Sequence, residues 1–316
     1  MPDKNEINPI KPDMIFDDQI VPFKVDALNI RGRTLQLGSV VNDILQKHAY
    51  PDKVAELLAQ MLALTALLGA SLKFQGKLIA QIHSDGPVNL LICDFQTPQA
   101  LRGYAKFDAE KIQGDISKNA LIGKGILAIT IDQGAKMRPY QAIVPLDGKT
   151  IEENIENYFS QSEQLPTKIR LSAAQYFSNE NNLKTWRAGG IFVQSLPEAS
   201  APSSDKENEQ ETRSAKDKWN EVEALIKTIE PSELIDPTIK ANNLLFRLFN
   251  AYDTHIFEPT SIKAQCNCSY ERLKGILENL SPEEKKEAAI DGKIEVSCEF
   301  CAQKYQFPLQ LLHKEH

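Results

Sequence analysis

Four of the five cysteines in this chain of 316 residues lie in two short clusters near its C-terminal end. Cys266 and Cys268 form a C-x-C motif, and Cys298 and Cys301 form a C-x-x-C motif after a gap of 29 residues. Each motif holds two sulfurs close together, and four converging thiolates suit the tetrahedral coordination that zinc prefers. The spacing therefore predicts one structural zinc ion per chain, with these four cysteines as its ligands.

The residues around the cysteines predict a small metal-dependent unit over 263–316. Ser269 is expected to cap a helix over 270–280, and Ser281 with Glu284 forms a capping box for a second helix. Short alternating segments on either side of the second motif are typical of strands. A unit of about fifty residues buries too little apolar surface to be stable through its core alone. We expect metal binding to supply most of its folding free energy, on the order of 10–16 kcal/mol in zinc peptides.

The composition and charge argue against nucleic acid as a partner, against a membrane span and against secretion. The net charge of −7 argues against nucleic acid, because phosphate recognition needs a basic face. The helix expected over 51–72 is apolar but contains Glu56, so we expect a buried core helix rather than a membrane span. The first residues carry Asp3, Glu6 and Asp13 and do not resemble a signal peptide. We therefore expect a cytoplasmic protein, in which paired cysteines are more often metal-binding or redox-active than structural disulfides.

The remaining sequence predicts an α+β fold. Strand-like segments occur in hairpins, as at 77–83 and 88–95, and helices lie between the hairpins, which favours α+β over a doubly wound sheet. We expect a disordered leader over 1–20 and an N-terminal domain of β-hairpins with packed helices over 21–197. Gly189-Gly190, inside one expected strand, predicts a bulge or close packing.

A polar segment and a helical region separate this domain from the cysteines. Residues 198–218 contain no large apolar side chain and predict a flexible tether. Residues 219–262 contain two amphipathic helical segments, which we expect to form a linker region. Their apolar faces include five candidate cover residues: Trp219, Leu225, Leu244, Leu248 and Phe249. These faces either cover the core of the N-terminal domain permanently or form a detachable cover.

Several short segments outside the cysteine motifs also point to one family. They are His48-Ala49-Tyr50-Pro51, Leu72-Lys73-Phe74-Gln75-Gly76, Asp85-Gly86-Pro87, Arg102-Gly103, Tyr158-Phe159, Ser162-Glu163-Gln164-Leu165-Pro166-Thr167 and Ala188-Gly189-Gly190. Together with the cysteine motifs, they resemble the bacterial redox-regulated holdase chaperone family, heat-shock protein 33. The resemblance runs from about Phe23 to Phe307. The leader and the tether look longer than is usual in that family, and Ala142 stands where the family tends to have glycine.

The resemblance implies a chaperone that works without ATP and is not an enzyme. It implies that the reduced, zinc-bound form is inactive and that oxidation joins Cys266 to Cys268 and Cys298 to Cys301. Zinc is then released, the linker region unfolds, and apolar surface becomes available to unfolded client proteins. The implied partners are these clients, a second copy of the chain on activation, and the ATP-dependent chaperones that later refold the clients.

Two other functions compete with this interpretation. A zinc-ribbon module that binds nucleic acid is disfavoured by the acidic composition. A thiol oxidoreductase would use Cys298 and Cys301, but its motif usually opens a helix, whereas a strand-like segment follows here. Of the remaining candidates, Cys93 is expected to be a buried small apolar residue, and His313 is not needed to complete the metal site.

Overall fold

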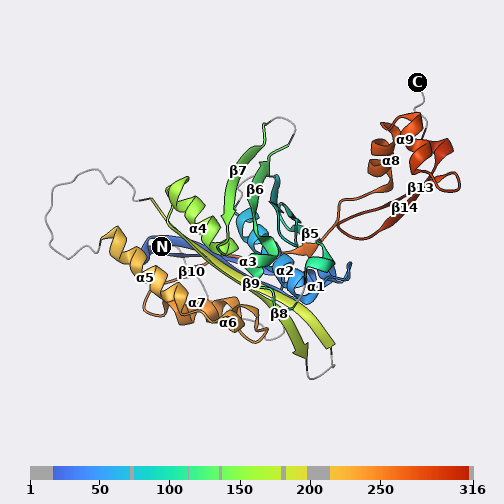
Figure 1. The fold of residues 1–316 in the computed structure, drawn as a ribbon. Helices are drawn as coiled ribbons and strands as arrows, with labels where there is room; N and C mark the ends of the chain where they lie inside the picture. The colour runs from blue at the N-terminus through green and yellow to red at the C-terminus, as the bar shows by residue number, and fades with distance from the viewer. Residues whose placement is uncertain are drawn as a thin grey trace.

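The computed structural model describes residues 17–71, 75–112, 114–134, 137–178, 183–197 and 214–312 (Figure 1). Most of the expected leader and tether lie outside these residues, as do residues 72–74 and His313. Within them the chain forms two six-stranded sheets, a two-stranded sheet near its C-terminal end, and helices that pack on them. The expected α+β fold is confirmed.

The first sheet, called sheet A here, joins the earliest described strands to much later ones. Its order is β10-β1-β2-β9-β8, and β11 also pairs with β1. The strands are β1 (Gln19–Val25), β2 (Ile30–Leu37), β8 (Thr167–Ser178), β9 (Leu183–Ser195), β10 (His255–Ile256) and β11 (Thr260–Ser261). Asn29 lies in the tight connection between β1 and β2 with φ of 52°, a left-handed conformation in which asparagine is enriched.

The second sheet, sheet B, has the order β12-β5-β4-β3-β6-β7. Its strands are β3 (Lys77–Ser84), β4 (Leu90–Gln96), β5 (Ala100–Lys106), β6 (Lys124–Asp132), β7 (Tyr140–Asp147) and β12 (Lys263–Ala264). The hairpin expected from the Asp85-Gly86-Pro87 signal is present as the antiparallel pair of β3 and β4. Sheet B is antiparallel apart from β12, which arrives from the far end of the chain and runs parallel to β5.

Helix α2 (Asp52–Gly69) forms the centre of the main core. It contacts strands of both sheets and is buried along most of its length. The shorter helices α1 (Ser39–Leu45), α3 (Lys118–Ile122) and α4 (Ile151–Gln161) complete this layer. The expectation of a buried core helix is therefore confirmed, and no described helix is long and apolar enough to cross a membrane. Strands β1–β9 and helices α1–α4 are called the body below.

Three helices, called the cover helices below, lie on the face of sheet A (Figure 1, orange). They are α5 (Ala215–Lys227), α6 (Pro231–Ile235) and α7 (Ala241–Phe249). Helix α5 begins before the expected Trp219, because the Ser214 hydroxyl accepts a hydrogen bond of 3.1 Å from the Asp217 amide and caps it. The linker region is also not helical throughout, since the chain is extended in β10 and β11 and pairs with β1. A two-residue strand carries too little alternation to be predicted from sequence.

The segment that carries the cysteines, called the cysteine unit below (residues 265–312), projects from the rest of the molecule in Figure 1. It contains α8 (Tyr270–Glu278), α9 (Pro282–Ala288) and the hairpin of β13 (Lys293–Ser297) and β14 (Lys304–Pro308). The expected Ser269 cap and the Ser281–Glu284 capping box are both present. Four buried side chains form its core: Leu277, Ile294, Phe307 and Leu312.

Candidate metal centre

The four clustered cysteines converge in the cysteine unit. Cys266 and Cys268 lie between β12 and α8, whereas Cys298 and Cys301 lie in the turn between β13 and β14. That turn is closed by two backbone hydrogen bonds, from Cys298 to the Gln303 carbonyl at 2.9 Å and from Ala302 to the Cys298 carbonyl at 2.8 Å. All four sulfurs lie within 4.8 Å of one another.

The distances between the sulfurs fit a single metal ion. The Cys266 and Cys298 sulfurs are 3.7 Å apart, and those of Cys268 and Cys301 are 3.4 Å apart. Sulfurs bound tetrahedrally at about 2.3 Å from zinc would lie about 3.8 Å from one another. The cluster can therefore hold one metal ion, and its four sulfur donors suit zinc.

The thiols differ in how readily they ionise. Burial opposes the ionisation of Cys266, but hydrogen bonds from Cys268, Arg102 and Cys298 outweigh it and lower the pKa of its thiol to about 7. Burial raises the pKa of Cys298 and raises that of Cys301 to about 12. Because the thiolate is the form that binds metals, Cys266 is the most readily ionised metal ligand of these three.

Two residues outside the cysteine motifs contact the sulfurs. Arg102, from β5 of the body, donates from Nη1 to the Cys266 sulfur at 3.7 Å. The Tyr305 hydroxyl lies 3.2 Å from the Cys268 sulfur, and this contact raises the pKa of Tyr305 to about 12. Sequence reasoning noted Arg102 only as part of the family resemblance and assigned neither residue to the site.

The five candidate cover residues gather in one apolar cluster with the strands of sheet A. Leu244, Leu248 and Phe249 are buried in it, and Trp219 and Leu225 pack against it. On the side of the body the cluster contains Phe23, Val25, Leu28, Ile30, Ile191 and Val193. The rings of Phe23 and Phe249 lie 5.7 Å apart, so α7 rests directly on β1.

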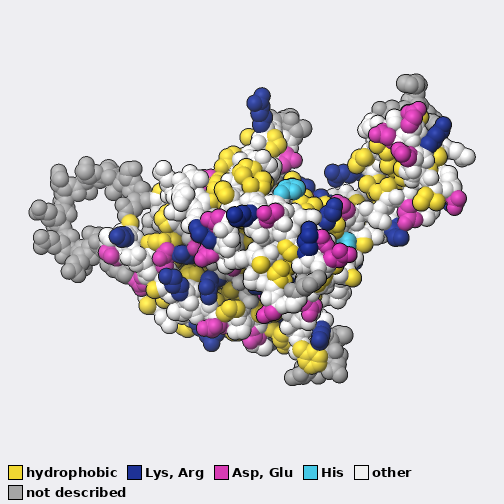
Figure 2. Space-filling model, in the orientation of Figure 1, with side chains coloured by type: hydrophobic (Ala, Val, Ile, Leu, Met, Phe, Trp, Pro, Cys, Tyr) yellow, Lys and Arg dark blue, Asp and Glu magenta, His cyan; other side chains and the backbone are white. Residues whose placement is uncertain are grey.

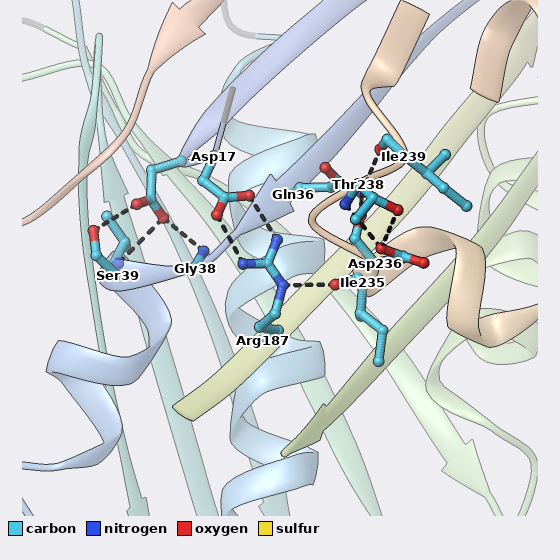
Figure 3. A network of polar contacts seen from close by, with 11 residues as sticks. Asp17, Gln36, Gly38, Ser39, Arg187, Ile235, Asp236, Thr238 and Ile239 are labelled. Carbon is cyan, nitrogen blue, oxygen red and sulfur yellow. Dashed lines mark hydrogen bonds and ion pairs between the residues drawn. The ribbon is translucent and has the colours of Figure 1, made fainter. Parts of the chain in front are cut away.

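Polar side chains of the body also hold the cover helices (Figure 3). Arg187 of β9 pairs with Asp17 through both terminal nitrogens, at 2.7 and 2.6 Å, and donates from Nε to the Ile235 carbonyl at 2.6 Å. Gln36 of β2 donates to the Asp236 carbonyl at 3.1 Å. Because helices leave their last carbonyls without partners, these contacts anchor the C-terminal end of α6 to sheet A.

Gly189 lets α6 approach the sheet this closely. A Cβ atom at this position would lie 1.9 Å from the Leu234 carbonyl oxygen, which is closer than any real contact. Pairing of β9 with β8 and with β2 continues through Gly189 and Gly190 in an unbroken register. Of the two expectations for these glycines, close packing is confirmed and a bulge is wrong.

The described residues give little support to a thiol oxidoreductase or to a zinc ribbon that binds nucleic acid. Cys298 and Cys301 lie in a turn that leads into β14, not at the start of a helix. On the face shown in Figure 2, Lys and Arg side chains are interspersed with Asp and Glu and gather in no large basic patch. Cys93 is buried in β4, as expected.

The chain is similar to known proteins over most of its length. The family model described as Hsp33 protein matches residues 18–308. The 33 kDa chaperonin of Caulobacter vibrioides is 39% identical over 305 residues, covering 94% of this chain and 97% of that protein. The 33 kDa chaperonin of Ectopseudomonas mendocina is 35% identical over 290 residues, covering 90% of each. The crystal structure of the 33 kDa chaperonin from Thermotoga maritima has the same fold, with a TM-score of 0.72 at 24% identity over 93% of this chain and 96% of that one.

Proposed function

This chain belongs to the Hsp33 family of chaperones, which are not enzymes, and we propose that it is an ATP-independent holdase controlled by the oxidation of its four clustered cysteines. The observation that carries the proposal is the convergence of four thiols in a unit with a very small core. A separate apolar cover rests on the body of the same chain. Oxidation of the thiols can unfold such a unit, and the unfolding can in turn release the apolar cover.

We propose that the metal is one zinc ion held by Cys266, Cys268, Cys298 and Cys301. The donor set and the distances between the sulfurs support zinc. When bound, zinc keeps the sulfurs as thiolates and contributes folding free energy to the unit. The four buried side chains of the unit are too few to replace that contribution.

Oxidation would remove the ligands. Each disulfide forms as two thiolates give two electrons to one molecule of hydrogen peroxide, which takes up two protons from the solvent and is reduced to two molecules of water. We propose that Cys266 pairs with Cys268 and Cys298 with Cys301. The distances in the folded unit allow other pairs, but once the unit loosens, residues close in sequence stay close in space because short loops cost the least entropy.

Loss of the folded cysteine unit would release the cover helices. The strands β10, β11 and β12 connect the cover helices to the cysteine unit. They would remain paired with β1 and β5 but would lose the support of the folded cysteine unit. The apolar surface between α7 and sheet A would then become available to unfolded client proteins. The same surface could bind a second copy of the chain, and ATP-dependent chaperones would later refold the clients. A cytoplasmic location would keep the thiols reduced until oxidative stress.

A matched pair of variants in α7 tests this function. Phe249 is 1% exposed and packs on Phe23, whereas Phe246 is 72% exposed on the same helix. Phe249→Ala should weaken the packing of the cover by about 3–5 kcal/mol. Phe246→Ala should change stability by less than about 0.5 kcal/mol. Suppression of client aggregation, followed by light scattering, is expected from the reduced Phe249→Ala variant and not from reduced Phe246→Ala or wild type.

Oxidation of the wild type provides the reference for that assay. Peroxide-treated protein should suppress aggregation and should have lost its zinc. If reduced and oxidised wild type suppress aggregation equally, control by oxidation is wrong. If the reduced Phe249→Ala and Phe246→Ala variants behave alike, the cover does not mask the client-binding surface.

A further inference from the structure

Arg102 belongs to the body but contacts both halves of the cysteine cluster. Its Nη1 donates to the Cys266 sulfur of the C-x-C motif at 3.7 Å. Its guanidinium carbon lies 3.9 Å from the ring centroid of Phe300, which lies between the cysteines of the C-x-x-C motif. Both contacts can form together only while the two motifs are held against each other.

The side chain of Arg102 is fixed from the opposite direction by a buried carboxylate. Its Nε and Nη2 donate to Asp94 Oδ2 at 2.7 and 2.5 Å, and Asp94 is 3% exposed. Lys77 Nζ lies 2.8 Å from the same oxygen. Two cations therefore share one carboxylate, and the Arg102 guanidinium extends from that carboxylate to the Cys266 sulfur. This arrangement suits a neighbouring thiolate, since hydrogen bonds between charged groups are stronger than neutral ones.

The backbone attaches the cysteine unit at the same place. The amide of Lys263 donates to the Gln99 carbonyl at 2.8 Å, and that of Gln265 donates to the Leu101 carbonyl at 3.1 Å. These bonds join β12 and the residue after it to the start of β5, just before Arg102. Residues 263–265 therefore connect sheet B directly to Cys266.

We propose that Arg102 is a positioning residue for the four clustered cysteines. It holds Cys266 in place as an outer partner of the metal site and slows the oxidation of Cys266. It also anchors the cysteine unit to sheet B. Groups that hydrogen-bond to metal ligands orient them and tune their reactivity. A cation that donates to a thiolate stabilises its charge and makes it a weaker nucleophile toward peroxide. The role in oxidation rests on the proposed function, whereas the roles in metal binding and anchoring do not.

Oxidation would break this anchor by simple electrostatics. A sulfur in a disulfide carries no negative charge, so the bond from Arg102 to Cys266 loses its charge-assisted character. Separation of the two motifs would also remove Phe300 from the guanidinium and end the cation–π contact. Arg102 would stay paired with Asp94 on sheet B. Residues 263–265 would then be held to sheet B by their backbone pairing alone, without the contacts of Arg102 with Cys266 and Phe300.

The test compares Arg102→Met with Lys106→Met, which removes a positive charge from the same strand. Reduced proteins are titrated with zinc alone against a chromophoric chelator, without client or oxidant. Arg102→Met should bind zinc about 10–100-fold more weakly than wild type, the usual effect of losing such an outer partner. Hydrogen exchange at 263–265 should be faster, while β13 and β14 remain protected. Lys106→Met should match wild type in both measurements.

The oxidation rate gives a second readout. Alkylation and mass spectrometry of the zinc-loaded proteins should show that peroxide oxidises Cys266 several-fold faster in Arg102→Met. Arg102→Lys keeps the charge but not the planar geometry, and its oxidation rate should lie between those of Arg102→Met and wild type. If Arg102→Met matches wild type in zinc affinity and in exchange at 263–265, the proposal is wrong.

Phe300→Leu keeps the test decisive if Arg102→Met does not fold. This variant removes the cation–π contact and leaves the Arg102–Asp94 pair in place, so exchange at 263–265 should again be faster. Unchanged exchange in Phe300→Leu would remove the support for anchoring. A wild type that is not activated by oxidation would contradict the holdase proposal but would leave the zinc and exchange results as a separate test of Arg102.

Discussion

The cysteines show how the surroundings of one side chain decide its chemistry. Cys93 points into the core of the body, and burial holds the pKa of its thiol well above the ordinary value. Burial opposes the ionisation of the partly exposed Cys266, but hydrogen bonds from Cys268, Arg102 and Cys298 outweigh it and lower the pKa of its thiol to about 7. A neutral buried thiol is inert, whereas an exposed thiolate can bind a metal or be oxidised.

This contrast gives a prediction for metal content. Cys266→Ser should lose most of its zinc, because three sulfurs leave one position of the tetrahedron without its ligand. Cys93→Ser should keep about one zinc ion per chain, since its side chain lies in β4 away from the cluster. Metal analysis of the two reduced variants after dialysis measures the difference. Equal zinc in both would contradict the ligand assignment.

Local signals made the four cysteines and the helix caps predictable from the sequence. The Ser269 cap and the Ser281–Glu284 capping box each involve residues three positions apart, and both are present. Arg102 was not predictable as part of the site, because it is separated from Cys266 by 164 positions in the sequence. Only the pairing of β12 with β5 brings the two together.

Among the elements, α6 is the one whose place depends most on the sheet beneath it. It has only five residues, too few for an apolar period to be recognised in the sequence. Its position is determined by the Gly189 backbone under Leu234 and by the bond from Arg187 to the Ile235 carbonyl. The long helix α2 was predictable because its apolar residues extend over five turns.

A methyl group at Gly189 should therefore displace α6. Gly189→Ala places a Cβ against the Leu234 carbonyl oxygen, and relief of such overpacking typically costs about 1–3 kcal/mol. Hydrogen exchange at 231–239 should be faster in the reduced, zinc-bound protein, and some aggregation should be suppressed without oxidant.

Gly275→Ala is the matched control for that change. Apart from its chain neighbours and the backbone of its own helix, no atom of the described residues lies within 4 Å of a Cβ at Gly275 in α8. Alanine in a helix is favoured over glycine by about 1 kcal/mol. This variant should be as stable as wild type or more so, with unchanged exchange at 231–239. Wild-type exchange in Gly189→Ala would show that α6 does not need the space that Gly189 leaves.

At the scale of the whole molecule, the three apolar cores formed by the described residues differ greatly in size. The core around α2 contains dozens of buried side chains, the cover has its own smaller cluster, and the cysteine unit has four buried side chains. Because local stability follows the amount of buried apolar contact, the cysteine unit should open first and the body last.

Removing the metal under reducing conditions tests this order. A chelator should abolish exchange protection in β13 and β14, because metal binding in such units is worth on the order of 10–16 kcal/mol in peptides. Protection should fall less in α5 and α7 and should persist in β3 and β6. Added zinc should restore the original pattern. Protection of β13 and β14 that survives the chelator would mean that the unit folds without metal.

The order of strands in sheet A has a consequence for how the protein is made. Strand β1 pairs with β10, so that Phe23 lies opposite Ile256. A ribosome completes β9 at Ser195 and must add about 60 more residues before it reaches β10, which takes roughly 3–12 s at 5–20 residues per second. The cover helices α5, α6 and α7 are synthesised only during that interval, so the face of sheet A stays partly uncovered until α7 ends at Phe249. Each new molecule therefore passes through a form with an uncovered sheet A during its synthesis. Slow translation of the segment after β9 would prolong this form.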